Sequence, residues 1–414
     1  MNKEVNNKLV PKLRFKEFEN YRWIEKPLEK ILKFQTGYPF ESKWFNKEGK
    51  GIRLIKNRDL KSDDNIVYYS NSFDDKFLVN KGDILIGMDG DFTPIVWNKG
   101  LALLNQRVGR IITNCEGEER FYLYFLTIQL SIIEQKTPRT TVKHLSHSDV
   151  EKINELLPES SKEQQKIADC LSSLDDLISA ENEKLDALKE HKKGLMQQLF
   201  PAEGEKVPKL RFPEFKDSGE WEEKSLDEIC KLVRGPFGGA LKKEIFVKDG
   251  FAVYEQFHAI YEDFSSFRYY IDNEKFSQLK RFSVNSGDLI MSCSGTMGKF
   301  AKIPEDFKQG VINQALLKLS VKEKKNSDFI KLSLELPLNQ DKLLSQSAGG
   351  AIKNVVAVDQ IRELKLYIPK TQEQQKIANF FSSLNEQITI QSKKIEDLRL
   401  HKKGLMQGLF PQVN

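Results

Sequence analysis

Two short segments of this 414-residue sequence carry residue types found in catalytic and metal sites, but at the wrong spacing. Residues 293–299 (CSGTMGK) approach a phosphate-binding loop, which requires Gly in place of Cys293 and Ser or Thr in place of Phe300. His144, His147 and Asp149 offer imidazole and carboxylate groups, yet HxxH is not the zinc-protease spacing. We therefore expect a Gly-rich turn in the first case and a surface or helix-start role in the second.

Other catalytic patterns are missing from the sequence. It has neither an Asn-Pro-Pro-aromatic tetrapeptide for methyl transfer nor a GxGxxG cofactor loop, and no carboxylates stand out as an acid–base pair. The sequence therefore predicts no catalytic residues, no metal ligands and no cofactor bound by this chain.

Several loops combine cations, amides and hydroxyls, the groups that contact base edges and phosphates in DNA. Each loop taken alone is also typical of a solvated turn. Two of them, at 139–143 and 350–354, occupy corresponding positions shortly before a long helix, which favours a shared role. The predicted DNA-binding residues are Lys56, Asn57, Arg58, Arg107, Arg139, Thr140, Thr141 and Lys143 in the N-terminal half, and Arg234, Gln256, Ser294, Thr296, Lys353 and Asn354 in the C-terminal half.

The overall charge is only mildly basic. Lys and Arg number 65 against 60 Asp and Glu, for a net charge of +5 and a pI near 8.7, so DNA contacts must come from local patches rather than a basic tail. No apolar run is long enough to span a membrane, and no apolar segment follows the N-terminus, so we expect a cytoplasmic protein. The four cysteines lie far apart, which argues against a disulfide scaffold.

An internal repeat organises the chain. Residues 161–201 align without a gap on residues 371–411, and 22 of the 41 paired positions carry the same residue. A second match, PKLRF, occurs at 11–15 and 208–212. The chain is therefore a tandem duplication.

Each repeated segment of 41 residues has the pattern of one long helix. Pro201 and Pro411 close the segments, and apolar residues recur at steps of three and four, which is typical of a coiled-coil seam. We expect the two helices to pack on each other. The predicted seam comprises Ile167, Leu174, Leu188, Leu195, Ile377, Leu384, Leu398 and Leu405.

The segments before the two helices carry short β-rich runs separated by Gly, Asn, Asp and Pro, together with apolar helical stretches. They predict two α/β or α+β globular domains. The expected boundaries are a first domain at 1–160, a long helix at 161–200, a linker at 201–208, a second domain at 209–370 and a second long helix at 371–411.

The motifs EQQKIA, SSL and HKKGLMQ-x-LFP make a resemblance specific. The chain resembles the DNA-sequence-specificity subunit of type I restriction–modification systems, over essentially its whole length. The resemblance implies two target-recognition domains and two long helices that pack antiparallel with pseudo-two-fold symmetry. It also implies a bipartite, asymmetric DNA site with one half read by each domain.

The same resemblance implies partners for the chain. Two methyltransferase (modification) subunits would dock on the helices, and restriction/translocase subunits would join through the complex. S-adenosylmethionine, ATP and Mg²⁺ are then expected on those partners, and extrusion of the target adenine would also fall to them. The alternative is a non-DNA adaptor, with two ligand or sensor domains on a coiled-coil rod. A methyltransferase that acts alone is not expected, because the sequence lacks the Asn-Pro-Pro-aromatic tetrapeptide.

Overall fold

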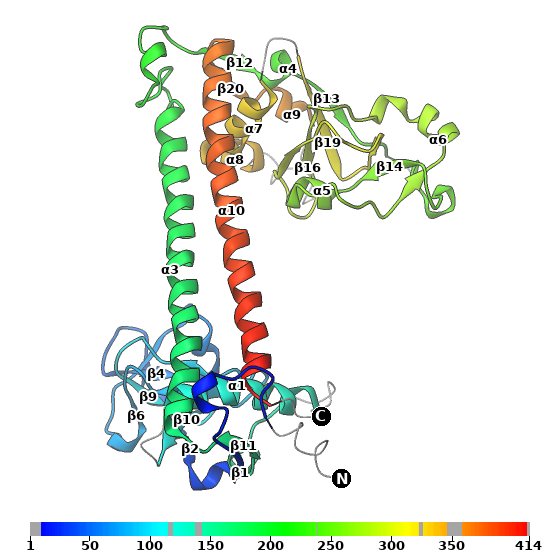
Figure 1. The fold of residues 1–414 in the computed structure, drawn as a ribbon. Coiled ribbons are helices and arrows are strands. Elements are labelled where there is room, and N and C mark those ends of the chain that lie inside the picture. Colours follow the sequence, from blue (N-terminus) through cyan, green and yellow to red (C-terminus); the bar gives the residue numbers. More distant parts are fainter. Residues whose placement is uncertain are drawn as a thin grey trace. The chain divides into compact units, whose positions relative to one another are not determined.

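The computed structural model describes residues 10–114, 119–136, 143–237, 239–322, 326–345 and 358–411. Its contacts divide the chain into two compact units: unit 1 is Met1–Glu183 with Lys393–Asn414, and unit 2 is Lys184–Ser392 (Figure 1). Two long helices, α3 (Ser161–Leu199) and α10 (Thr371–Leu409), are each cut near the middle by this division. Each unit thus holds one globular part and one half of each long helix, whereas the sequence-based boundaries kept the helices whole.

The described residues of unit 1 form two sheets and a two-stranded pair. One sheet is antiparallel, with the order β2 (Leu32–Thr36), β10 (Val108–Thr113), β7 (Ile84–Gly87) and β8 (Ile95–Val96). The other has the order β3 (Phe45–Asn46), β5 (Val67–Tyr69), β4 (Ile52–Ile55), β9 (Ala102–Leu104) and β6 (Leu78–Val79), with β4 and β9 parallel. β1 (Trp23–Pro27) pairs with β11 (Asn154–Pro158).

Unit 2 repeats this plan in its described residues. β13 (Cys230–Arg234), β19 (Leu316–Val321), β16 (Leu289–Ser292) and β17 (Phe300–Lys302) form the antiparallel sheet. The second sheet has the order β15 (Tyr270–Ile271), β14 (Phe251–Tyr254) and β18 (Gly310–Ile312), again with a parallel pair, β14 and β18. β12 (Glu222–Ser225) pairs with β20 (Lys365–Ile368). The duplication is therefore structural as well as sequential.

Short helices complete each globular part. Unit 1 has α1 (Glu119–Lys136) and α2 (His147–Glu151). Unit 2 has α4 (Leu226–Ile229), α5 (Gln256–Tyr261), α6 (Asn273–Gln278), α7 (Ser327–Glu335), α8 (Pro337–Ser345) and α9 (Val358–Arg362). The short β-rich runs and the apolar helical stretches expected in the globular parts are present as strands and helices. The mixed α/β class and the two-domain organisation are confirmed.

In unit 1 the PKLRF motif fixes the start of α3. Arg14 makes two hydrogen bonds of 2.7 and 2.8 Å to the carboxylate of Glu163, in the first turn of α3, and Trp23 Nε1 donates to the same carboxylate at 3.1 Å. Glu163 is buried. Phe410, just beyond the end of α10, packs edge-on against Trp23 and at a tilt against Phe121 of α1. One end of each long helix is therefore part of the globular core.

Unit 2 contains the same arrangement. Arg211 makes two hydrogen bonds of 2.7 Å to Glu373, in the first turn of α10. Phe200, just beyond the end of α3, packs against Trp221 and Phe329. The repeated PKLRF, EQQ and LFP motifs are thus a structural frame that joins helix ends to globular parts, a role that the sequence analysis did not assign to them.

Polar contacts within unit 1 show that the helix halves run antiparallel. Asp175 pairs with Lys402, Asn182 accepts from Arg399 at 3.3 Å, and Glu181 pairs with Lys394. Asp175 contacts residue 402, whereas Glu181 and Asn182, later along α3, contact residues 394 and 399, earlier along α10, which is the pattern of antiparallel helices.

The predicted seam residues differ in burial and in what they pack against. Ile167, Ile377 and Leu384 are buried, whereas Leu174, Leu188, Leu195, Leu398 and Leu405 are half-buried. Ile167 packs into the core of unit 1, and Ile377 and Leu384 into that of unit 2. The apolar stripe is needed at each helix end to cover a globular core, which is why its pattern persists along the whole helix.

No helix in the described ranges is long and apolar enough to cross a membrane.

Candidate nucleic-acid interface

Several predicted DNA-binding residues of unit 1 lie where four loops meet. Backbone hydrogen bonds join the loops: Met88 N donates to Arg107 O (3.0 Å), Gly90 N to Lys143 O (3.0 Å) and Leu145 N to Met88 O (2.8 Å). The side chain of Asn57 ties in the fourth loop, because its Nδ2 donates to Asp89 O at 2.7 Å. The structure thus brings together Asn57, Arg107 and Lys143, and we name the loops at 56–58, 88–91, 105–107 and 143–144 the unit 1 loop cluster.

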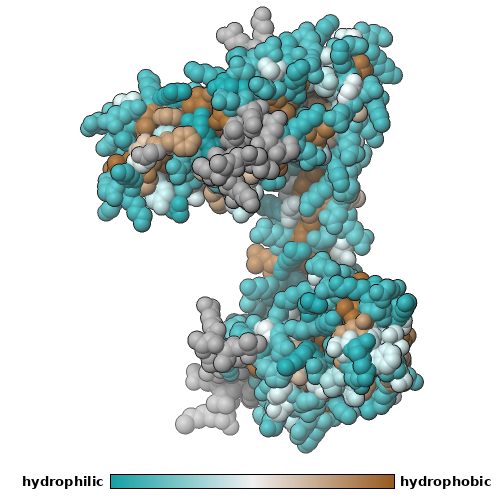
Figure 2. All heavy atoms as spheres, turned by 180° about the vertical axis from the view of Figure 1, so that it is seen from behind, coloured by the Kyte–Doolittle hydropathy of each residue, from teal (hydrophilic) through white to brown (hydrophobic). Residues whose placement is uncertain are grey.

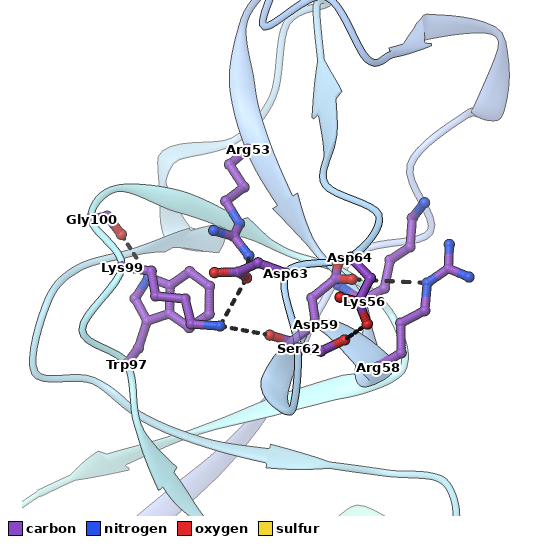
Figure 3. Close-up of polar contacts among 10 residues, drawn as sticks. All are labelled: Arg53, Lys56, Arg58, Asp59, Ser62, Asp63, Asp64, Trp97, Lys99 and Gly100. Carbon is purple, nitrogen blue, oxygen red and sulfur yellow. Dashed lines mark hydrogen bonds and ion pairs between the residues drawn. The ribbon is translucent and has the colours of Figure 1, made fainter. Parts of the chain in front are cut away.

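The short helix η5 (Asn57–Leu60) positions Lys56 and Arg58 in this cluster. Buried Asp59 accepts the backbone N–H of Lys56 at 2.8 Å. Figure 3 shows Lys56 and Arg58 extending to one side, away from a group in which Arg53 and Lys99 lie over the ring of Trp97.

Arg53 and Lys99 both pair with Asp63, and Lys99 Nζ also donates to Asp59 O at 3.3 Å. These contacts hold the side of η5 that lies opposite Lys56 and Arg58.

Burial, together with the neighbouring charge of Arg58, lowers the pKa of Lys56 below its ordinary range.

A histidine and a carboxylate flank Arg107. His144 Nδ1 lies 2.9 Å from Asp89 Oδ1, and Arg107 Nη1 lies 3.4 Å from both of these atoms. His147 lies in different surroundings, with Nδ1 2.9 Å from Phe34 O, at the start of α2. The two histidines therefore share no site, and no group of three or more His, Cys, Asp or Glu in the described part of the chain could hold a metal ion.

Unit 2 has an equivalent loop cluster at 255–257, 293–296 and 313–315. Gln256 Nε2 donates to Thr296 O (3.3 Å), and Ser294 Oγ donates to Gln256 Oε1 (3.1 Å), so three predicted residues come together. Arg234 Nε donates to Gln314 O at 3.1 Å, which places this fourth residue beside the same loops. A hollow of about 460 Å³ opens here, lined by Glu255, Gln256, Phe257, His258, Ser266, Arg268, Asn313 and Ala315.

The apparent phosphate loop is a turn within this cluster. Residues 293–299 connect β16 to β17, and Lys299 N donates to Ser292 Oγ at 3.0 Å. Burial raises the pKa of Cys293 to about 12, so its thiol stays protonated and unreactive at neutral pH. The connection between the two strands agrees with the expected Gly-rich turn.

The two clusters share a backbone frame but differ in side chains. Asn57 and Gln256 follow the corresponding strands β4 and β14, and each amide binds the backbone of a turn whose glycine has positive φ, Gly90 (83°) or Gly295 (60°). The acceptor lies just before the glycine in unit 1 (Asp89 O) and just after it in unit 2 (Thr296 O), and the surrounding side chains diverge. The corresponding pairs are Lys56 and Glu255, Arg58 and Phe257, Asp89 and Ser294, and Arg107 and Ala315.

A glycine at a close crossing also recurs. A Cβ on Gly37 would lie 2.2 Å from Leu104 O, and one on Gly235 would lie 1.8 Å from Asn313 O. The loop after the first strand of each antiparallel sheet therefore passes directly over the Asn-Gln loop. Gly37 was missed by sequence reasoning, although its place after a β-rich run was a usable signal.

Five predicted residues, Arg139, Thr140, Thr141, Lys353 and Asn354, lie outside the described residues. Lys143 is described, and its Nζ lies 3.2 Å from Glu134 Oε1. DNA contact by any of the predicted residues stays a prediction.

Known proteins resemble the chain over nearly its full length. It is 25% identical to the EcoBI specificity subunit of Escherichia coli, a type I restriction enzyme subunit, over 94% of this chain and 85% of the relative. It is 22% identical to the MjaVIII specificity subunit of Methanocaldococcus jannaschii over 99% and 94% of the two chains. The S subunit of a type I restriction–modification system from M. genitalium has the same fold, with a TM-score of 0.60, 16% identity and coverage of 98% and 100%.

The family described as "Type I restriction modification DNA specificity domain" matches twice, at residues 20–190 and 218–400. Each match takes in one globular part and most of the helix that follows it, as the duplication requires. The chain therefore belongs to the type I restriction–modification DNA specificity family.

Proposed function

We propose that this chain is the DNA-recognition subunit of a type I restriction–modification complex, in which each unit reads one half of a bipartite, asymmetric site. The observation that carries the proposal is the pair of loop clusters, which keep one frame while their side chains diverge. A frame with Arg107 and Asp89 and one with Ala315 and Ser294 present different donors and acceptors. They suit different base sequences.

The chain itself performs no catalytic step in this proposal. Two methyltransferase subunits and the restriction/translocase subunits bring S-adenosylmethionine, ATP and Mg²⁺, and the complex acts on cytoplasmic DNA. A modest net charge fits this division of labour, because partner subunits contribute further phosphate contacts. The face drawn in Figure 2 is mostly hydrophilic, with some exposed apolar side chains. Family membership gives no support to the adaptor alternative.

The test is to co-express the chain with its methyltransferase in a host that lacks adenine methylation and to map methylated adenines across the genome. The proposal predicts one motif made of two specified blocks separated by unspecified bases. A single contiguous motif would contradict the division between units. The absence of sequence-specific methylation, with a complex that still assembles, would favour the adaptor.

A further inference from the structure

The four described cations of the unit 1 loop cluster are held in different ways. Lys56 Nζ lies 5.3 Å from the ring centre of Phe45, and Lys143 is tied to Glu134. The side chain of Arg58 is 59% exposed, and its Nε lies 3.8 Å from Asp59 Oδ1. Arg107 alone among them is flanked by both a carboxylate and an imidazole.

The backbone of Arg107 is fixed on both sides. It sits in a tight turn after β9, in which Val108 N donates to Asn105 O (2.9 Å) and Gln106 N donates to Tyr38 O (3.1 Å). Its own carbonyl accepts from Met88 N. The Cα of Arg107 is therefore held between two strands rather than on a free loop tip.

One edge of the Arg107 guanidinium is held while the other faces solvent. Nη1 contacts Asp89 and His144, and no residue in the described part of the chain takes the hydrogen bonds of Nη2 or Nε. The side chain is 55% exposed, against 29% for Asp89. The remaining donors, Nη2 and Nε, point outward. Because the side chain is already held, binding through them loses little further conformational entropy.

A carboxylate beside the arginine also disfavours a phosphate contact, because like charges repel. A guanine presents O6 and N7 as a pair of acceptors in the major groove, and bidentate arginine is the commonest partner for them. Resting on the proposed function, we propose that Arg107 reads a guanine in the half-site of unit 1, with Asp89 and His144 as positioning residues. The corresponding unit 2 residues, Ala315 and Ser294, lack these groups, so unit 2 reads its half-site by other contacts.

The test uses the full chain in complex with its methyltransferase, with Arg107→Ala, Arg107→Lys and the wild type compared by mapping methylated adenines and by binding to the identified site. Arg107→Ala is expected to lose discrimination at one guanine of the first block by about 5- to 100-fold, and Arg107→Lys, whose ammonium can still donate to O6 and N7, is expected to lose less; both should leave the second block fully specified. Arg58→Ala is the matched control. It is expected to weaken binding to all sequences, reduce the salt dependence and leave the motif unchanged.

Asp89→Asn tests the positioning role, because it keeps the shape of the side chain and removes its charge. It should relax the same guanine position to a smaller degree, and Asp89→Glu should restore part of the discrimination. A structural role alone would lower thermal stability without changing the motif.

Three results would overturn the inference: a first block without guanine in either strand, an Arg107→Ala motif identical to that of the wild type, or an Arg107→Ala loss that is equal for all sequences. A retained second block shows that a variant is folded and assembled. If the wild-type complex methylates no bipartite site, the proposed function itself fails; if it does and Arg107 variants keep the motif, only this inference fails.

Discussion

At the scale of single residues, two buried ion pairs explain why the PKLRF and EQQ motifs occur in both repeats. The side chains of Arg14 and Glu163 are 10% and 1% exposed, and those of Arg211 and Glu373 are 7% and 1% exposed. Removing one partner of a buried pair leaves the other uncompensated, which costs about 3–5 kcal/mol. The pairs are also placed well, since a carboxylate is favoured in the first turn of a helix.

We predict that Glu163→Ala and Glu373→Ala both lower the free energy of unfolding, and that Glu163→Ala has the larger effect. Glu163 also accepts from Trp23 Nε1, whereas Trp221 Nε1 has no hydrogen-bond partner in the described residues. Urea denaturation followed by circular dichroism measures both variants. Equal losses would mean that the tryptophan hydrogen bond contributes nothing measurable.

At the scale of elements, two glycines can be compared: one lies where there is no room for a side chain, and the other lies where there is room. Gly235→Ala would place a Cβ against the backbone of Asn313. Forcing the loop apart should cost about 1–3 kcal/mol and relax the second half-site only.

Gly404→Ala is the control. Gly404 lies within α10, and apart from the nearby backbone of that helix, no atom lies within 4 Å of a Cβ added there. It should raise the free energy of unfolding by about 0.5–1 kcal/mol. Thermal melting and the methylation motif distinguish the two variants. A Gly235→Ala protein with unchanged stability and motif would show that the crossing is not needed.

The long helices offer a second contrast, between buried and exposed leucines. Leu384→Asp puts an unpaired charge into the core of unit 2 and should cost several kcal/mol. Leu400 is 68% exposed, so Leu400→Asp should change stability by no more than about 0.5 kcal/mol. If methyltransferase subunits dock on the helices, it should still weaken co-elution with them in size-exclusion chromatography. Normal assembly would place docking elsewhere.

The sequence predicted the helices and the strand-rich segments, but not which of these elements pair or pack with one another. Steps of three and four revealed α3 and α10 because a helix that covers a core at each end needs an apolar face along its whole length. The pairing of β4 with β9, far apart in sequence, leaves no local signal, and neither does the meeting of Arg107, Asp89 and His144. Candidate loops could be chosen by composition, but which of them share a cluster depends on strand order.

At the scale of the whole molecule, the duplication makes the two helix ends interchangeable. Phe410 packs against Trp23 in unit 1 as Phe200 packs against Trp221 in unit 2, and Leu13 N donates to Gly408 O as Leu210 N donates to Gln198 O. A fragment of residues 1–201 keeps the first globular part and α3 but lacks the α10 end that covers its core. The α3 end of a second copy carries the same LFP motif and can take that place.

We therefore predict that the 1–201 fragment forms a symmetric homodimer, measurable by light scattering coupled to size-exclusion chromatography. Leu199→Asp within the fragment should prevent dimerisation, because Leu199 is one of the apolar groups that would have to be buried. A fragment that is folded and monomeric would show that the two helix ends are not equivalent.

The central claim is that each unit reads its own half-site, and the most direct measurement compares methylated-adenine maps of the full chain and the 1–201 fragment, each co-expressed with the methyltransferase. The account predicts an asymmetric bipartite motif for the full chain and, for the fragment, an interrupted palindrome built from the first block and its inverted repeat. A fragment motif that is not palindromic, or that contains the second block, would contradict it.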